Sequence, residues 1–142
     1  MKVGKISFII ISFLLLAGVV GCEKENNQES PSQLTGTRWE LAGIVDAKTG
    51  IITPLAPKDC YWFTFISETK AQGRSVINVM EVYLTDPPII GIVTEVGDDQ
   101  NGDAVLFYSI IRTIESYTWK KNELKFFFNN KQQYLLYKYS KA

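Results

Sequence analysis

Few side chains in this chain of 142 residues could act as nucleophiles, general bases or metal ligands. There is no histidine, and the two cysteines are Cys22 and Cys60. Because histidine is the commonest general base and metal ligand, its absence argues against Ser-His and Cys-His hydrolases. Cys60 precedes Tyr-Trp-Phe, which favours a buried, inert thiol over a reactive one. We therefore expect a protein that is not an enzyme, with no catalytic residues, no metal ion and no cofactor.

An acidic segment, "DDQNGD" at residues 98–103, resembles a calcium loop. Alternating carboxylates on a tight turn can supply several of the six to eight oxygens that calcium takes. However, an EF-hand loop aligned on Gly102 would begin at Gly97 and end at Tyr108, and neither residue fits as a ligand. A polar turn in which Asp103 caps a following helix is the favoured interpretation.

Glutamate pairs are a further candidate for chemistry. Glu115 with Glu123, or Glu40 with Glu95, could in principle act as the two carboxylates of a glycosidase. Nothing in their spacing singles them out, so solvated strand faces are the favoured interpretation.

Aromatic side chains are the strongest candidates for binding. In "CYWFTFI" and "KFFFNN" both faces of an extended strand would be apolar or aromatic, so one face points away from the core unless something covers it. Core packing explains most of these residues, but exposed aromatic patches are usually functional. The predicted ligand-binding or partner-binding residues are Trp39, Trp62, Phe127 and Tyr137.

Strands must position these residues. Alternation and β-branched or aromatic composition predict successive strands separated by turn signals. The predicted strands span 37–46, 51–52, 60–66, 74–85 and 89–96. Apolar residues at helical spacing predict a short helix over 106–114, and turn residues at 121–122 and 129–131 predict two C-terminal hairpins.

No strand–helix–strand alternation supports a parallel sheet. We therefore predict a mainly β fold, a small antiparallel β-barrel that curls or closes, with one short α-helix before the C-terminal hairpins.

The first 21 residues predict an export signal. Lys2 and Lys5 precede an apolar stretch that is short for a membrane-spanning helix. Val19-Val20-Gly21-Cys22 resembles the bacterial lipobox, which implies cleavage before Cys22 and lipid on its sulfur. The alternative is a plain secretory signal with an incidental cysteine. Multiple acyl chains would anchor the protein firmly to a membrane.

Residues 22–33 are predicted to form the lipidated cysteine and a flexible, polar tether. Glu23-Lys24-Glu25 resembles the tether of surface-exposed lipoproteins of gut Bacteroidetes, although a simple solvated linker also fits. We expect a lipoprotein of the outer membrane, attached to either the periplasmic or the surface-exposed face of that membrane. Removing residues 1–21 removes two of the 15 basic residues and none of the 15 acidic ones, so the mature chain is slightly acidic and no nucleic-acid partner is expected.

Two segments carry a family resemblance. "LTGTRWEL" at 34–41 resembles the opening of META/HslJ-like domains and related lipocalin-like lipoproteins, and 109–138 is similar to their closing pattern. This resemblance implies that 34–142 is a small β-barrel or half-barrel without catalysis. Two departures are Ile77-Asn78, where a Gly-Cys-Asn-like element is expected, and the extra residue between Gly36 and Trp39.

The function we expect is that of a non-enzymatic, lipid-anchored envelope lipoprotein that binds a small apolar ligand or an envelope protein. The alternative is a protease-inhibitor-like or stress-related envelope factor that acts through an exposed aromatic face. The interior decides between cargo and partner binding, because a small barrel either is filled by side chains or holds one small ligand.

Overall fold

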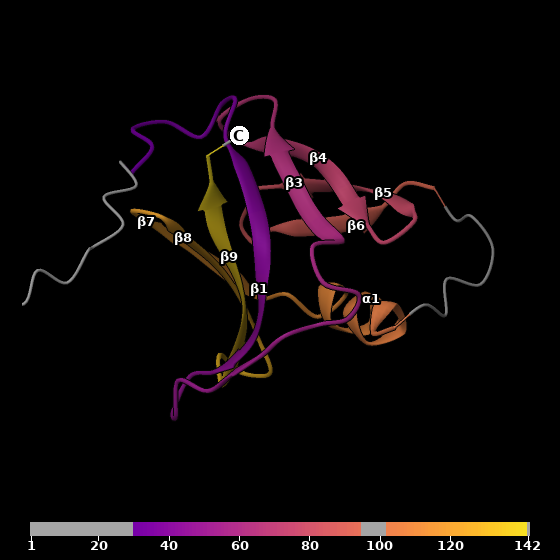
Figure 1. Cartoon of the computed structure of the whole chain (residues 1–142). Helices are drawn as coiled ribbons and strands as arrows, with labels where there is room; N and C mark the ends of the chain where they lie inside the picture. Colours follow the sequence, from indigo (N-terminus) through magenta and orange to yellow (C-terminus); the bar gives the residue numbers. More distant parts are fainter. Residues whose placement is uncertain (1–29, 95–101, 142) are drawn as a thin grey trace, which may run out of the picture.

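The computed structural model describes residues 30–94 and 102–141, which form one antiparallel sheet and one short helix (Figure 1). The predicted signal peptide, Cys22, Glu95 and residues 98–101 of the acidic segment lie outside the described residues. The strands are β1 (Arg38–Asp46), β2 (Ile52–Thr53), β3 (Tyr61–Phe65), β4 (Lys70–Ser75), β5 (Asn78–Tyr83), β6 (Ile89–Ile92), β7 (Ser116–Lys120), β8 (Glu123–Phe128) and β9 (Gln133–Ser140). The helix α1 spans Ala104–Ile111.

The sheet curls into a half-barrel. Its strand order is β6-β5-β4-β3-β1-β9-β8-β7, and β2 pairs with the second half of β1. Within the described part of the chain, β6 and β7 are the two edges (Figure 1). The predicted mainly β fold with a short helix before the C-terminal hairpins is confirmed, and among residues 30–94 and 102–141 the two edge strands do not pair with each other.

Aromatic residues fill the inner face of the sheet. The Phe63 ring lies 4.5 Å from that of Tyr137, and Phe126 packs edge-on against Tyr137 at 5.9 Å. Phe63, Phe126 and Tyr137 are all fully buried. Since each such ring removes a large apolar area from water, these contacts account for much of the core.

One predicted strand, 74–85, is instead a hairpin. The chain reverses at Val76 and Ile77, and Ser75 faces Asn78 across the turn. Val76 has a φ of 58°, a conformation that usually marks Gly or Asn in a hairpin turn. Because neither Gly nor Asn occupies position 76 or 77, the sequence pattern did not predict this turn, and residues 70–73 of β4 were not predicted as strand.

A glycine makes the approach of β4 to β3 possible. Gly73 faces Phe63, and a Cβ atom there would lie 1.8 Å from the Trp62 carbonyl oxygen. Since real contacts are never that short, any side chain at this position would push the two strands apart. The absence of a side chain at Gly73 therefore allows β3 and β4 to pair this closely.

The helix α1 packs below the sheet at the end away from the C-terminus (Figure 1). Its Phe107 ring lies 4.8 Å from the ring of Tyr61. The prediction that the Asp103 side chain caps this helix is wrong, because no capping hydrogen bond forms. Instead, Asp103 Oδ2 accepts from the Ala56 N–H at 2.8 Å, and the Asp103 N–H donates to the Ala56 oxygen at 2.7 Å. Asp103 thus ties the helix to the loop before β3.

The chain enters the sheet through a carboxylate contact. Glu68, in the turn between β3 and β4, accepts hydrogen bonds from the backbone N–H groups of Leu34 and Thr35 at 3.0 and 2.9 Å. The Thr35 hydroxyl also donates to Glu68. These bonds, the hydroxyl's first, lower the pKa of Glu68. Glu68 therefore fixes the start of the domain at one end of the sheet.

Candidate functional site

The outer face of the sheet carries the candidate site. On β3, Tyr61, Phe63 and Phe65 are buried, whereas Trp62 and Thr64 are half-buried and point outward. Because side chains alternate along a strand, residues in register with Trp62 on neighbouring strands share its face.

Trp62 lies at the centre of a group of charges. It is in register with Glu40 on β1 and Arg74 on β4. The guanidinium carbon of Arg38 lies 3.9 Å from the centroid of the Trp62 ring, which makes a cation–π contact. Arg38 Nε also lies 3.1 Å from Glu40 Oε1, so the guanidinium is held over the ring. The outer face of β3 thus carries an indole ring that a guanidinium cation covers on one side.

A second aromatic group lies on the same face of β8 and β9. Phe127 and Tyr134 are in register, and their rings are 5.3 Å apart. Lys125 Nζ lies 5.0 Å from the Tyr134 ring and 3.4 Å from Glu123 Oε2. The half-buried rings of Phe127 and Tyr134 thus pack with each other, and Tyr134 also packs with a cation.

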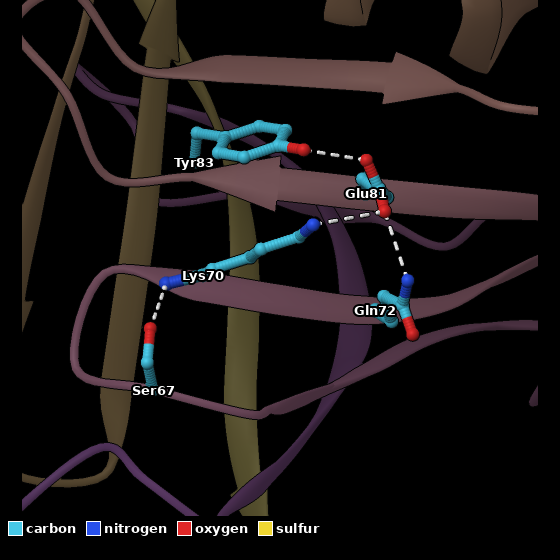
Figure 2. A network of polar contacts seen from close by, with 5 residues as sticks. All are labelled: Ser67, Lys70, Gln72, Glu81 and Tyr83. Atoms are coloured by element: carbon cyan, nitrogen blue, oxygen red, sulfur yellow. Dashed lines mark hydrogen bonds and ion pairs between the residues drawn. The ribbon is translucent and has the colours of Figure 1, made fainter.

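A carboxylate network on β4 and β5 completes the outer face (Figure 2). Glu81 accepts hydrogen bonds from the Tyr83 hydroxyl at 2.6 Å and from Gln72 Nε2 at 2.8 Å, and Lys70 Nζ lies 3.2 Å away. The bond from Tyr83, then those from Gln72 and Lys70, lower the pKa of Glu81 to about 2. The same contacts with Tyr83 and Glu81 raise the pKa of Lys70. Glu81 is consequently a fixed anion and a poor general base at neutral pH.

Trp39 and Tyr137, two of the predicted binding residues, lie in the core. Both are 0% exposed, and Trp39 Nε1 donates to Thr37 Oγ1 at 2.8 Å. The Tyr137 hydroxyl has no hydrogen-bond partner among the described residues. Its burial, and secondarily the nearby Tyr61, raise the pKa of Tyr137. The structure therefore separates these two residues from Trp62 and Phe127, and their part in binding stays a prediction.

The other candidate groups have structural contacts. Glu115 Oε1 accepts from the Asn130 N–H at 2.8 Å, while Glu40 and Glu123 pair with cations on their own strands. Cys60 is half-buried and packs against the core. Within residues 30–94 and 102–141, no group of three acidic, histidine or cysteine side chains is placed to hold a metal ion.

Sequence reasoning missed the cations that accompany the outer aromatics. Arg38 and Lys125 contact aromatic rings on neighbouring strands, and Arg74 lies in register with Trp62. These placements depend on how the strands pair, which alternation along one strand does not reveal. The one available signal was the Arg-Trp-Glu and Glu-Leu-Lys alternation, which places cation and carboxylate on the same face of a strand.

Comparison with known proteins identifies a relative of almost the same length. The chain is similar to a protein of Tannerella forsythia that bears the name "Putative lipoprotein". The two are 69% identical over 137 residues, which cover 96% of this chain and 97% of the relative. No protein-family model and no solved structure matches the chain, so membership of the META/HslJ-like domains remains a prediction. In the described part of the chain, no helix combines the length and apolarity needed to cross a membrane.

Proposed function

Because this chain belongs to the same family of lipoproteins as the Tannerella forsythia protein, we propose that it is a non-enzymatic envelope lipoprotein that binds a protein partner through the outer face of its sheet. Lipid on Cys22 anchors it to the outer membrane. The lipobox-like Val19–Cys22 segment and the name of the relative support this anchoring.

The position of Trp62 carries the proposal. Its indole is half-buried on the outer face, stacked with Arg38 and in register with Arg74. Tryptophan and arginine are the residue types that most often dominate binding energy in protein interfaces, and a half-covered indole retains area to bury. Glu81 is held ionised by its three contacts, so it is a poor general base at neutral pH.

The charges of this face favour an acidic partner. The carboxylates Glu40, Glu81 and Glu123 are each already paired with a cation. Arg74 and Lys138 lie in the same row of the sheet as Trp62 and have no ion pair among the described residues. Arg74 lies directly beside the indole, and Lys138 lies two strands away from it, beyond Glu40. Both exposed cations suit carboxylates on the partner.

The filled interior weighs against a cargo function. Nine or more aromatic and aliphatic side chains of the inner face have less than 2% of their surface exposed. A barrel of this size that is filled with side chains has no room for a ligand.

Affinity purification tests the binding face. The full-length tagged chain is cross-linked in cells, purified from the envelope and compared with Trp62→Ala and Arg74→Glu variants. We expect one protein to be recovered with the wild type and reduced at least tenfold with both variants. Lys48→Glu, on the exposed turn after β1, is the charge-matched control and should retain it. Equal recovery with all variants would rule out this face.

Two further measurements test the cargo-binding alternative and the lipid anchor. Native mass spectrometry of the purified chain would show an extra, denaturation-sensitive mass if the barrel holds cargo instead. Cys22→Ala should move the protein from the membrane pellet to the soluble fraction, whereas continued pelleting would contradict the lipid anchor without affecting the binding face.

A further inference from the structure

The edge strand β6 is unusually apolar. Within the described residues β6 pairs with β5 alone, and residues 89–93 read Ile-Ile-Gly-Ile-Val. Natural sheet edges normally carry lysine, proline or a bulge that discourages pairing with another strand. No charged or polar side chain interrupts residues 89–93, so none of them discourages pairing with another strand, while the helix α1 contacts β6.

Two side chains of residues 89–93 are largely exposed to solvent. Ile89 is 56% exposed and Val93 is 57% exposed. Ile89 is in register with Tyr83, and Gly91 with Glu81, so all three alternate residues of the segment face outward with the outer face of β5. Exposed β-branched residues on both sides of a glycine are a surface that a further strand would cover.

The backbone of β6 also has an open side. The Val93 N–H donates to the Val79 oxygen at 2.9 Å, which places Val93 in a hydrogen-bonded pair with β5. In an antiparallel ladder such pairs alternate, so Gly91 and Ile89 also direct their backbone groups toward β5. The N–H and C=O groups of Ile90 and Ile92 consequently point away from the sheet.

We propose that the occupant of this edge is a second copy of the chain, with the two β6 strands paired antiparallel about a two-fold axis at Gly91. In this register Ile90 faces the partner's Ile92, so the outward backbone groups of both copies bond each other completely. On the outer face, Ile89 packs against the partner's Val93 across the axis.

The register follows from features of the segment itself. The sequence is nearly symmetric about Gly91, and a Cβ there would meet nothing within 4 Å, so the axis is unobstructed. A shift of two residues toward the N-terminus would place Ile92 opposite the partner's Pro88, which has no N–H to donate. Since the segment carries no charge, a second copy brings no like-charge repulsion.

Cysteine cross-linking in membranes tests the pairing with the full-length chain. Gly91→Cys would meet its own copy across the axis at a Cα separation of about 4.5 Å, within the range of a disulfide. We expect copper phenanthroline to give a disulfide-linked dimer. Ile89→Cys alone and Val93→Cys alone should link at least tenfold less, whereas cells that express both single variants should form the mixed dimer.

Matched controls decide the outcome. The wild-type protein shows how much dimer forms through Cys60. Thr118→Cys, on the opposite edge strand β7, shows how much forms through random collision. Adding Ile89→Lys and Val93→Lys to Gly91→Cys should abolish the dimer, with circular dichroism confirming that the fold is retained. The proposal is wrong if Gly91→Cys gives no dimer, gives no more than Thr118→Cys, or links to a different protein.

Discussion

The inner and outer faces of this sheet use neighbouring aromatic residues in different ways. Phe63 points inward, is 0% exposed and contacts the rings of Phe65, Phe126 and Tyr137. Trp62, one residue earlier, points outward and is stacked by the Arg38 guanidinium. Inner rings are surrounded by apolar atoms, while outer rings are surrounded by charges that water can replace.

Because of this difference, substitutions of inner rings should affect stability, whereas substitutions of outer rings should affect partner binding. Removal of an inner ring leaves a cavity that the close-packed core cannot fill, so its cost appears as stability. Removal of an outer ring exposes groups that water can solvate, so its cost to stability is small and its effect should appear in partner binding.

The two glycines of the β3–β6 half give the strongest test of this contrast. Gly73→Ala forces a Cβ into the β3 backbone and should destabilise the domain by more than about 4 kcal/mol. Gly91→Ala, where a Cβ meets nothing, should change stability by less than about 1 kcal/mol in either direction. Urea unfolding followed by Trp fluorescence measures both. Similar losses for the two variants would contradict the inner close approach.

Truncation of adjacent rings is the next largest contrast. Phe63→Ala should lower the free energy of unfolding by about 3–5 kcal/mol. Trp62→Ala should lower it by only about 1 kcal/mol, mostly through loss of the cation–π contact with Arg38. Because Trp62→Ala changes fluorescence, circular dichroism is the appropriate probe. A larger loss for Trp62 would show that the outer face also carries the fold.

Tyr137→Phe should stabilise the protein. The buried hydroxyl has no hydrogen-bond partner among the described residues, so removing it avoids a desolvation penalty of about 1–3 kcal/mol. Thermal unfolding should show a higher Tm than the wild type. Tyr134→Phe, on the outer face, is the matched control and should leave Tm nearly unchanged. A lower Tm for Tyr137→Phe would indicate a partner for this hydroxyl.

The smallest expected effect is a pH dependence confined to the outer face. The folded pKa of Glu81 is lowered to about 2 by Tyr83, Gln72 and Lys70. Since the unfolded value is 4.5, its contribution is complete above pH 4.5 and disappears as the pH falls toward 2. Glu81→Gln should therefore flatten the stability profile in this window. An unchanged slope would assign the acid sensitivity to other carboxylates such as Glu68.

Alternation along the chain predicted much of the fold. The strand over 37–46, the aromatic strand over 60–66 and both C-terminal hairpins appear as β1, β3, β7–β8 and β8–β9. The hairpin at Val76 was missed because tight turns are recognised by Gly and Asn, and here the sheet on both sides imposes the turn on a valine.

The candidate site was less accessible to prediction. Composition indicated that some aromatics must face outward, but only register determines that Trp62 does so and Trp39 does not. The Asp103 side chain was expected to cap its own helix, and the Ala56 N–H, 47 residues away, bonds it instead. Both depend on contacts between distant segments, which local patterns cannot show.

The grip of Glu68 on Leu34 and Thr35 has a mechanical consequence. These hydrogen bonds attach the first residues of the domain to the sheet, close to the C-terminus of the chain (Figure 1). Leu34 follows Cys22 by 12 positions, and each residue spans at most about 3.5 Å. A lipid at Cys22 would therefore keep Leu34 within about 40 Å of the bilayer surface. This length would set the largest distance from the membrane at which the outer face could meet a partner.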